Sequence, residues 1–189
     1  MSVERSHTAE LSFEKKSGRT RTGCSWEAAA YRNAVQNFIH AVNVDSTSAE
    51  GLPVYRYTSD NLVLSGAEIG IGYVPARWPN WKIESSLAYV HASKTFEQMP
   101  PTRWRTELGW SRAKWGRMEQ LYGRISVDCL ADYSVVQLSL GARFSERLTL
   151  GIGAHNLLNT TYIPVLSLLK NLGIAEPGRN ISLRLVLSL

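Results

Sequence analysis

Serine and lysine residues provide the clearest catalytic motifs in this sequence. The patterns S-x-x-K, S-D-N and K-T-G together mark serine acyl-transfer enzymes of the penicillin-binding type, and this chain has matches to the first two and a K-S-G that resembles the third. They occur at 111–114, 167–170, 59–61 and 16–18. Their order is reversed, however, with K-S-G first and S-x-x-K last. No helical apolar period surrounds either serine, although the nucleophile of this class begins a helix. We therefore interpret the matches as coincidental, and we predict no catalytic residue and no enzyme activity.

Metal, redox and phosphate chemistry have even less support. The four histidines are isolated and lack the spacing of metal ligands, and they are His7, His40, His91 and His155. Cys24 and Cys129 form no C-x-x-C pair, so we interpret both as incidental small residues. The glycines near Gly70 do not form a phosphate loop, because a strand pattern continues through them instead of a helix. No metal site and no cofactor are predicted.

Composition limits the class of protein further. The 189 residues suit one domain, spanning 1–189, with no linker or low-complexity tract. The net charge of +5 arises from Lys and Arg that are mostly scattered singly, so we do not expect nucleic acid as a partner. No run of about 18 apolar residues occurs, which excludes a transmembrane helix, and the first 20 residues lack the apolar core of a signal peptide.

Strict alternation of apolar and polar residues dominates the chain and predicts β-strands. The C-terminal segment is the clearest case, with one face formed by Ile181, Leu183, Leu185, Leu187 and Leu189. Arg184 lies on the opposite face. Similar patterns predict nine strands, at 6–15, 23–41, 54–74, 80–95, 102–114, 118–130, 133–145, 147–156 and 179–189. Short turns mostly alternate with longer joints at 43–53, 96–101 and 157–178. We therefore predict an all-β, antiparallel up-and-down meander of about nine long strands.

Tryptophan positions suggest what the apolar face meets. Five indoles fall beside the short turns, namely Trp26, Trp78, Trp81, Trp110 and Trp115. Trp104 is near a long joint. In an antiparallel meander the short turns share one rim, so these five would form part of a ring. Indole rings gather at bilayer interfaces because they combine an apolar body with a hydrogen-bonding tip. The alternative is that each Trp covers the core of a soluble β-sandwich.

Several motifs, in their order along the chain, resemble TonB-dependent outer-membrane receptors. The stretch GIGAHNLLNTTY at 151–162 resembles the signature near the end of these proteins, and PGRN at 177–180 leads into a last strand as it does in the family. Upstream, the segments at 37–39, 65–68 and 100–103 resemble family motifs in the same order. The likeness covers nearly the whole chain, and it implies a segment of a larger transmembrane β-barrel.

The resemblance also implies a function and partners. Such receptors take up iron complexes or similar scarce nutrients across the outer membrane of Gram-negative bacteria. The large barrels have about 22 strands and a plugged lumen, whereas nine strands are predicted here, and the chain ends in Leu189 instead of an aromatic residue. We therefore expect the C-terminal part of a receptor barrel, without signal peptide, plug domain or TonB box.

Such a part would be embedded in outer-membrane lipid beside the missing plug and the remaining strands. It would reach TonB only through the plug, so it would not transport alone. The ligand, for which the resemblance suggests a ferric chelate, would meet the extracellular loop at 157–178, within which no individual binding residue is assigned. A soluble all-β binding module, such as a β-sandwich, is the alternative.

Overall fold

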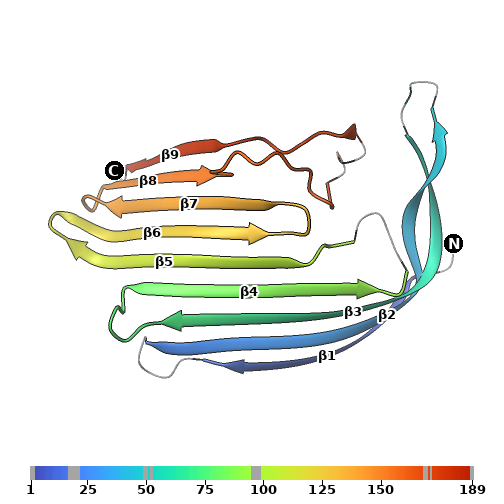
Figure 1. Ribbon diagram of the computed structural model, residues 1–189, viewed down its shortest axis with the longest axis horizontal. Helices are drawn as coiled ribbons and strands as arrows, with labels where there is room; N and C mark the ends of the chain where they lie inside the picture. The colour runs from blue at the N-terminus through green and yellow to red at the C-terminus, as the bar shows by residue number, and fades with distance from the viewer. Residues whose placement is uncertain are drawn as a thin grey trace.

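The computed structural model describes residues 3–16, 22–48, 51, 53–94, 99–167, 170 and 172–187. They form a single antiparallel sheet in which each strand pairs with the next one along the chain (Figure 1). The strands are β1 (Arg5–Lys15), β2 (Gly23–Thr47), β3 (Pro53–Val74), β4 (Trp81–Ala92), β5 (Arg103–Trp115), β6 (Met118–Cys129), β7 (Ser134–Arg143), β8 (Leu148–His155) and β9 (Asn180–Leu187). The predicted meander of nine strands is confirmed.

Cross-strand pairing carries each face of the sheet across many strands, because paired residues of antiparallel strands point to the same side. One such row is apolar apart from its last position and consists of Phe13, Ala28, Ile69, Leu87, Trp104 and Cys129. The neighbouring row, one residue along each strand, consists of Glu14, Glu27, Gly70, Ser86, Arg105 and Asp128. We call the two sides the apolar face and the polar face.

The sheet is one layer deep. A β-sandwich would bury one face of each sheet against a second sheet, but no second sheet covers either face among the described residues. Large apolar side chains are therefore exposed, such as Leu183 at 75% and Ile181 at 69%. The most buried polar side chains of the strands, Ser126 and Asp128, lie on the polar face. This arrangement contradicts the sandwich alternative.

The long connections and the short turns lie at opposite rims (Figure 1, right and left). The short-turn rim joins β3 to β4, β5 to β6 and β7 to β8, and the long-loop rim includes the connection from β8 to β9. Trp81 pairs directly with Trp110 near the short-turn rim. Trp26 pairs with Ile71 near the same rim, and Trp78 lies in the turn between β3 and β4. The predicted gathering of indoles on this side is confirmed.

Two strand ends differ from the prediction by more than two residues. β2 runs to Thr47 instead of 41, because β2 and β3 continue past their neighbours as a two-stranded ribbon (Figure 1, right). The register of this pair shifts between Val35 and Phe38, where Asn37 has a φ of 54°. β4 ends at Ala92, before the predicted 95. The ribbon was missed because its segment at 43–53 is polar, and its pairing depends on the opposite strand.

Two tyrosines lie flat over glycines on the polar face. Tyr31 pairs with Gly66, where an added Cβ would meet the tyrosine Cζ at 2.4 Å. Tyr122 pairs with Gly141, where an added Cβ would meet the tyrosine Cε1 at the same distance. A side chain at either glycine would displace the ring, so these glycines provide space for a close approach and are not turn residues.

No helix in the described part of the chain is long and apolar enough to cross a membrane.

Candidate functional site

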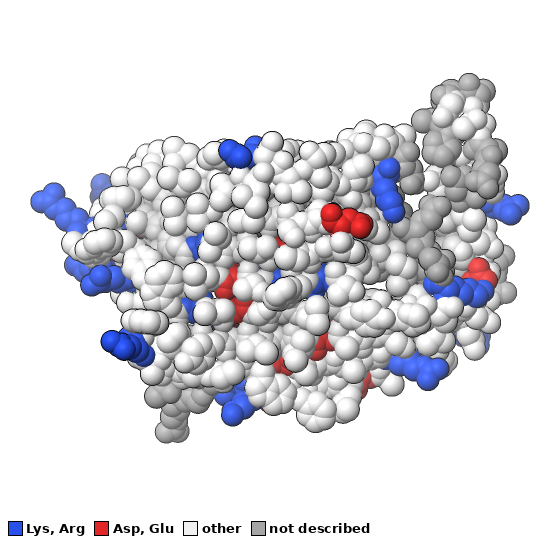
Figure 2. All heavy atoms as spheres, viewed as in Figure 1, with Lys and Arg blue, Asp and Glu red and all other residues white. Residues whose placement is uncertain are grey.

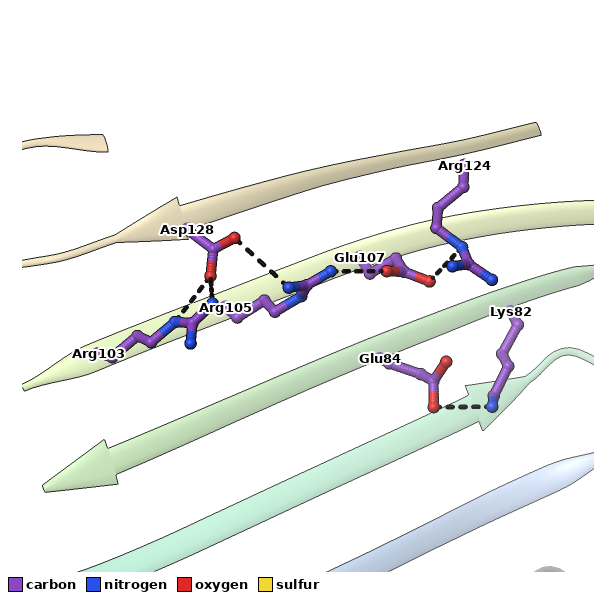
Figure 3. A network of polar contacts seen from close by, with 7 residues as sticks. All are labelled: Lys82, Glu84, Arg103, Arg105, Glu107, Arg124 and Asp128. Carbon is purple, nitrogen blue, oxygen red and sulfur yellow. Dashed lines mark hydrogen bonds and ion pairs between the residues drawn. The ribbon is translucent and has the colours of Figure 1, made fainter. Parts of the chain in front are cut away.

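A chain of ion pairs occupies the polar face over β5 and β6 (Figure 3). Arg103 donates to Asp128 Oδ1 from Nε at 2.9 Å and from its terminal nitrogen at 2.6 Å. Arg105 lies 3.6 Å from the other oxygen of Asp128 and donates to Glu107 at 3.2 Å. Arg124 lies 2.8 Å from Glu107. Three guanidinium groups therefore share two carboxylates, in the alternating order that lowers repulsion between like charges.

The carboxylates of this network are more enclosed than the arginines. The side chain of Asp128 is 6% exposed and that of Glu107 is 15% exposed, whereas Arg103 and Arg124 remain more than half exposed. The acids thus form the base of the network, and the guanidinium groups cover them. A carboxylate this enclosed needs its partners, because a buried charge without compensation is costly. The free sides of the arginines remain available to a further polar surface.

Beside this network the sheet forms a hollow of mixed charge. Its volume is about 440 Å³, and its lining includes the carboxylates of Glu14, Glu27, Glu84 and Glu107 and the cations of Lys15, Lys16 and Arg105. Glu84 is paired with Lys82 at 2.7 Å (Figure 3). A Cβ at Gly70 would lie 2.8 Å from Glu27 Oε1, so the absence of a side chain at this glycine leaves room for the hollow.

The described residues do not assemble a catalytic or metal-binding group. Ser111 and Lys114 lie on one strand, three residues apart, and their side chains therefore start on opposite sides of β5. Lys170 N–H donates to the carbonyl of Ser167 in a turn, with 168 and 169 outside the described residues. The 59–61 segment lies within β3, and 17 and 18 of the K-S-G match also lie outside the described residues. No group of three or more His, Cys, Asp or Glu able to hold a metal occurs in the described ranges.

The two cysteines are free and lie on different strands, with Cys24 exposed on β2 and Cys129 partly exposed on β6.

The segment after β8 is fixed by Asn156, which is 0% exposed. Its side-chain oxygen accepts from the N–H of Thr160 at 2.8 Å, and its amide nitrogen donates to the carbonyl of Thr160 at 2.8 Å. Asn159 Oδ1 accepts from the N–H of Arg179 at 2.8 Å, which ties the start of the loop to its end. Both asparagines have positive φ values, 51° and 58°, a conformation that asparagine tolerates better than most residues.

Two tyrosines stack at the base of this loop. Tyr133, from the turn between β6 and β7, lies with its ring centroid 4.4 Å from that of Tyr162. Burial raises the pKa of both phenols, and the charge of Glu176 raises the pKa of Tyr162 further. The N–H of Glu176 donates to the carbonyl of Tyr162 at 2.9 Å. The predicted ligand loop at 157–178 is thus anchored at both ends, and its positions 168, 169 and 171 lie outside the described residues.

Comparison with known proteins identifies the family. The profile described as TonB dependent receptor-like, beta-barrel, matches residues 3–157. The chain belongs to this family of outer-membrane receptor barrels. The structure agrees with that assignment, since a barrel of this type combines an apolar outer face with a polar interior. The polar face therefore corresponds to the lumen side of a TonB-dependent receptor barrel, and the apolar face to its outer side.

Solved structures show the same fold. The structure titled Copper transporter OprC aligns with 97% of this chain at a TM-score of 0.74 and 19% identity. The siderophore receptor PirA from Pseudomonas aeruginosa aligns with 97% at a TM-score of 0.60 and 22% identity. A mutant of the ferric enterobactin receptor PfeA from Pseudomonas aeruginosa aligns with 98% at a TM-score of 0.67 and 19% identity.

This chain covers 31%, 30% and 31% of those three chains, so it spans about a third of their length. A search of curated proteins found no match. At these identities the solved structures establish the barrel fold, and the ligands in their titles belong to those proteins.

The ion-pair network was only half visible in the sequence. Period-2 alternation in the predicted strand at 102–114 puts Arg103, Arg105 and Glu107 on one face, and the structure places them together on the polar face. Their partners Arg124 and Asp128 were missed, because nothing local in β6 says which residue of β5 each one opposes. The observed register pairs Asp128 with Arg105 and Ser126 with Glu107. Opposite charges on adjacent predicted strands were the available signal.

Proposed function

We propose that the chain is part of an outer-membrane receptor that takes up an iron complex or a similar scarce nutrient with energy supplied through TonB. The observation that carries the proposal is the separation of the two faces over one continuous sheet. Apolar rows suit the lipid of a Gram-negative outer membrane, and the charged rows suit a filled, aqueous lumen. The long-loop rim is then extracellular, since the periplasmic turns of such barrels are short.

In this proposal the polar face contacts the plug domain of the complete receptor. The half-exposed guanidinium groups of Arg103 and Arg124 offer charge-assisted hydrogen bonds to carboxylates or carbonyls of a plug. The hollow beside them offers charged groups of both signs to side chains of a plug. TonB would act on the plug, so this segment alone would not transport.

The proposed ligand contact is the loop at 157–178. Exposed apolar side chains on an anchored loop favour contact with a ligand, and Leu158, Leu172 and Ile174 are 66%, 54% and 47% exposed. The Tyr133–Tyr162 stack supports the loop from below. The two anchors at Asn156 and Asn159 hold the loop ends together, so substitutions at its exposed residues should leave the barrel intact.

The test uses the full-length gene product in a Gram-negative host that lacks its own receptors for ferric chelates. We expect the protein in the outer-membrane fraction, and we expect growth on at least one ferric chelate as the sole iron source. Replacing both Leu172 and Ile174 by Ser should lower uptake at least fivefold with unchanged outer-membrane yield. The matched control is Arg147→Ser, in the turn of the opposite rim, which should leave uptake unchanged.

Recovery of the protein in the soluble fraction would contradict the membrane placement. Equal uptake by the loop variant and the control would reject the loop as the ligand contact.

A further inference from the structure

A shallow groove marks the apolar face near the short-turn rim, over β5 to β9. Its volume is about 300 Å³, and nearly all of its surface is apolar. The side chains that line it include Trp110, Leu121, Leu140, Phe144 and Leu183. Leu140 pairs with Gly123 and with Ile152, so one row of the apolar face crosses the groove. Gly123 contributes to its depth, because an added Cβ would lie 3.2 Å from the Leu140 side chain.

A cation of β5, Arg112, adjoins the lining of this groove. Arg112 is the cross-strand partner of Leu121 and lies two residues beyond Trp110 on the same side of β5. Its guanidinium carbon lies 5.8 Å from the centroid of the Trp115 ring, in cation–π contact. Among the described residues, no carboxylate lies within ion-pair distance of Arg112 (ion pairs of the neighbouring Lys114 go to Glu119).

The wider rim has the same charge. Figure 2 shows Lys and Arg atoms along the left edge, where the short turns lie, and the visible Asp and Glu atoms mostly further toward the middle. Arg77 repeats the arrangement of Arg112, with its guanidinium carbon 6.0 Å from the centroid of Trp78 in the turn between β3 and β4. Arg77 lies in the turn between β3 and β4, away from the strands β5 to β9 that carry the groove, which makes it a natural control.

We propose that the groove and Arg112 bind one glycerophospholipid of the inner leaflet, and this inference rests on the proposed membrane placement. One acyl chain lies in the groove, where apolar contact favours it. The phosphate accepts hydrogen bonds from the Arg112 guanidinium, for which no carboxylate of the described residues competes. Trp115 holds the guanidinium at headgroup level, where indole is also favoured. A free anion would contact only Arg112, and a neutral diacylglycerol would contact only the apolar groove.

The test measures lipid bound to the full-length gene product extracted from outer membranes in a mild detergent. After washing, dioleoyl phosphatidylglycerol is added, and bound phosphorus per protein is read together with native mass spectra. We expect about one tightly bound phospholipid per protein. Arg112→Gln should weaken its binding about tenfold. Arg77→Gln, the matched control at the other stacked arginine, should bind as the wild type does.

A second variant tests the groove without removing charge. Ala142→Leu adds an apolar side chain to the groove lining and should lower lipid retention at least fivefold. Dioleoylglycerol and inorganic phosphate serve as probes of the two halves, and neither should displace the bound phospholipid at equal concentration. Displacement by inorganic phosphate would overturn the inference in favour of a simple anion site.

Other outcomes separate this inference from the proposed function. Wild-type protein that is recovered in the outer membrane but retains no phospholipid overturns the lipid site alone. Equal losses in Arg112→Gln and Arg77→Gln would overturn it too, because they would show general attraction to a basic rim. Recovery of the protein in the soluble fraction overturns both proposals.

Discussion

Trp104 and Arg105 are neighbours in the chain, yet their surroundings differ completely. Trp104 lies on the apolar face between Leu87 and Cys129, with its indole donating to Ser85 at 2.8 Å. Arg105 lies on the polar face and contacts two carboxylates. The difference shows that each strand presents one face to an apolar and the other to a polar environment. A shift of one residue in register would move every side chain of the strand to the opposite face. The two faces should therefore respond oppositely to the same kind of substitution.

The strongest test of this contrast exchanges a charge between the faces of β9. Leu185 belongs to the apolar row with Ala142 and Leu150, whereas Arg184 pairs with Gly151 on the polar side. Leu185→Arg should cost about 2–4 kcal/mol and impair insertion, because it places a cation in lipid. Arg184→Leu should leave assembly nearly intact. Outer-membrane yields of the two variants in the full-length gene product provide the measurement, and equal yields would contradict the assignment of the faces.

A medium effect is expected where a tyrosine lies over a glycine on the polar face. Gly141→Ala would bring a methyl group into the ring of Tyr122, and we expect a loss of about 1–3 kcal/mol from overpacking. Gly109→Ala is the control, because its added Cβ would have only one neighbour within 4 Å, a carbonyl at 3.9 Å. Urea unfolding in lipid vesicles would measure both. In protein that already carries Tyr122→Ala, Gly141→Ala should cause no further loss of stability. A further loss would show that contact with the ring is not the cause.

A smaller effect should separate enclosed from exposed charges on the polar face. Asp128→Asn removes the acid that holds Arg103 and Arg105, and we expect a loss of about 1–2 kcal/mol, discounted because both arginines are partly exposed to water. Glu84→Gln breaks an exposed pair with Lys82 and should cost less than about 1 kcal/mol. The same unfolding assay compares the two. Equal losses of stability in the two variants would mean that the enclosure of Asp128 does not strengthen its ion pairs.

Much of the fold could be read from alternation, since period-2 patterns report which side of a strand is apolar. Alternation predicts the two faces of β9 and of β5. The pairing of Leu185 with Leu150 and of Arg105 with Asp128 confirms them. Irregular positions could not be read. Gln120, with a φ of 49°, lies at a register shift in β6 between Glu119 and Tyr122. The residue types around it do not predict this shift. Such shifts depend on how two strands fit together, which local sequence does not encode.

The candidate site was less accessible to sequence reasoning than the fold. The turn at Asn156 was visible as the end of an alternating run, and β8 indeed ends at His155. The reciprocal bonds between Asn156 and Thr160, and the tie from Asn159 to Arg179, join residues whose proximity depends on the path of the loop. The groove beside Arg112 depends on five strands at once, so it could not be predicted from any one segment.

The outermost strands have a consequence for how the chain reaches a membrane. Among the described residues, β1 and β9 lie at opposite edges of the sheet and each pairs with only one strand, so part of the backbone N–H and C=O groups along each of them have no ladder partner there. In hydrocarbon each unsatisfied group costs several kcal/mol, and the sum over an edge strand exceeds what its apolar side chains gain. Insertion must therefore wait until both edges have found strands to pair with. Closure of the wall and entry into lipid are then one coupled event, and an unclosed sheet would remain at the membrane surface as a substrate for chaperones and proteases.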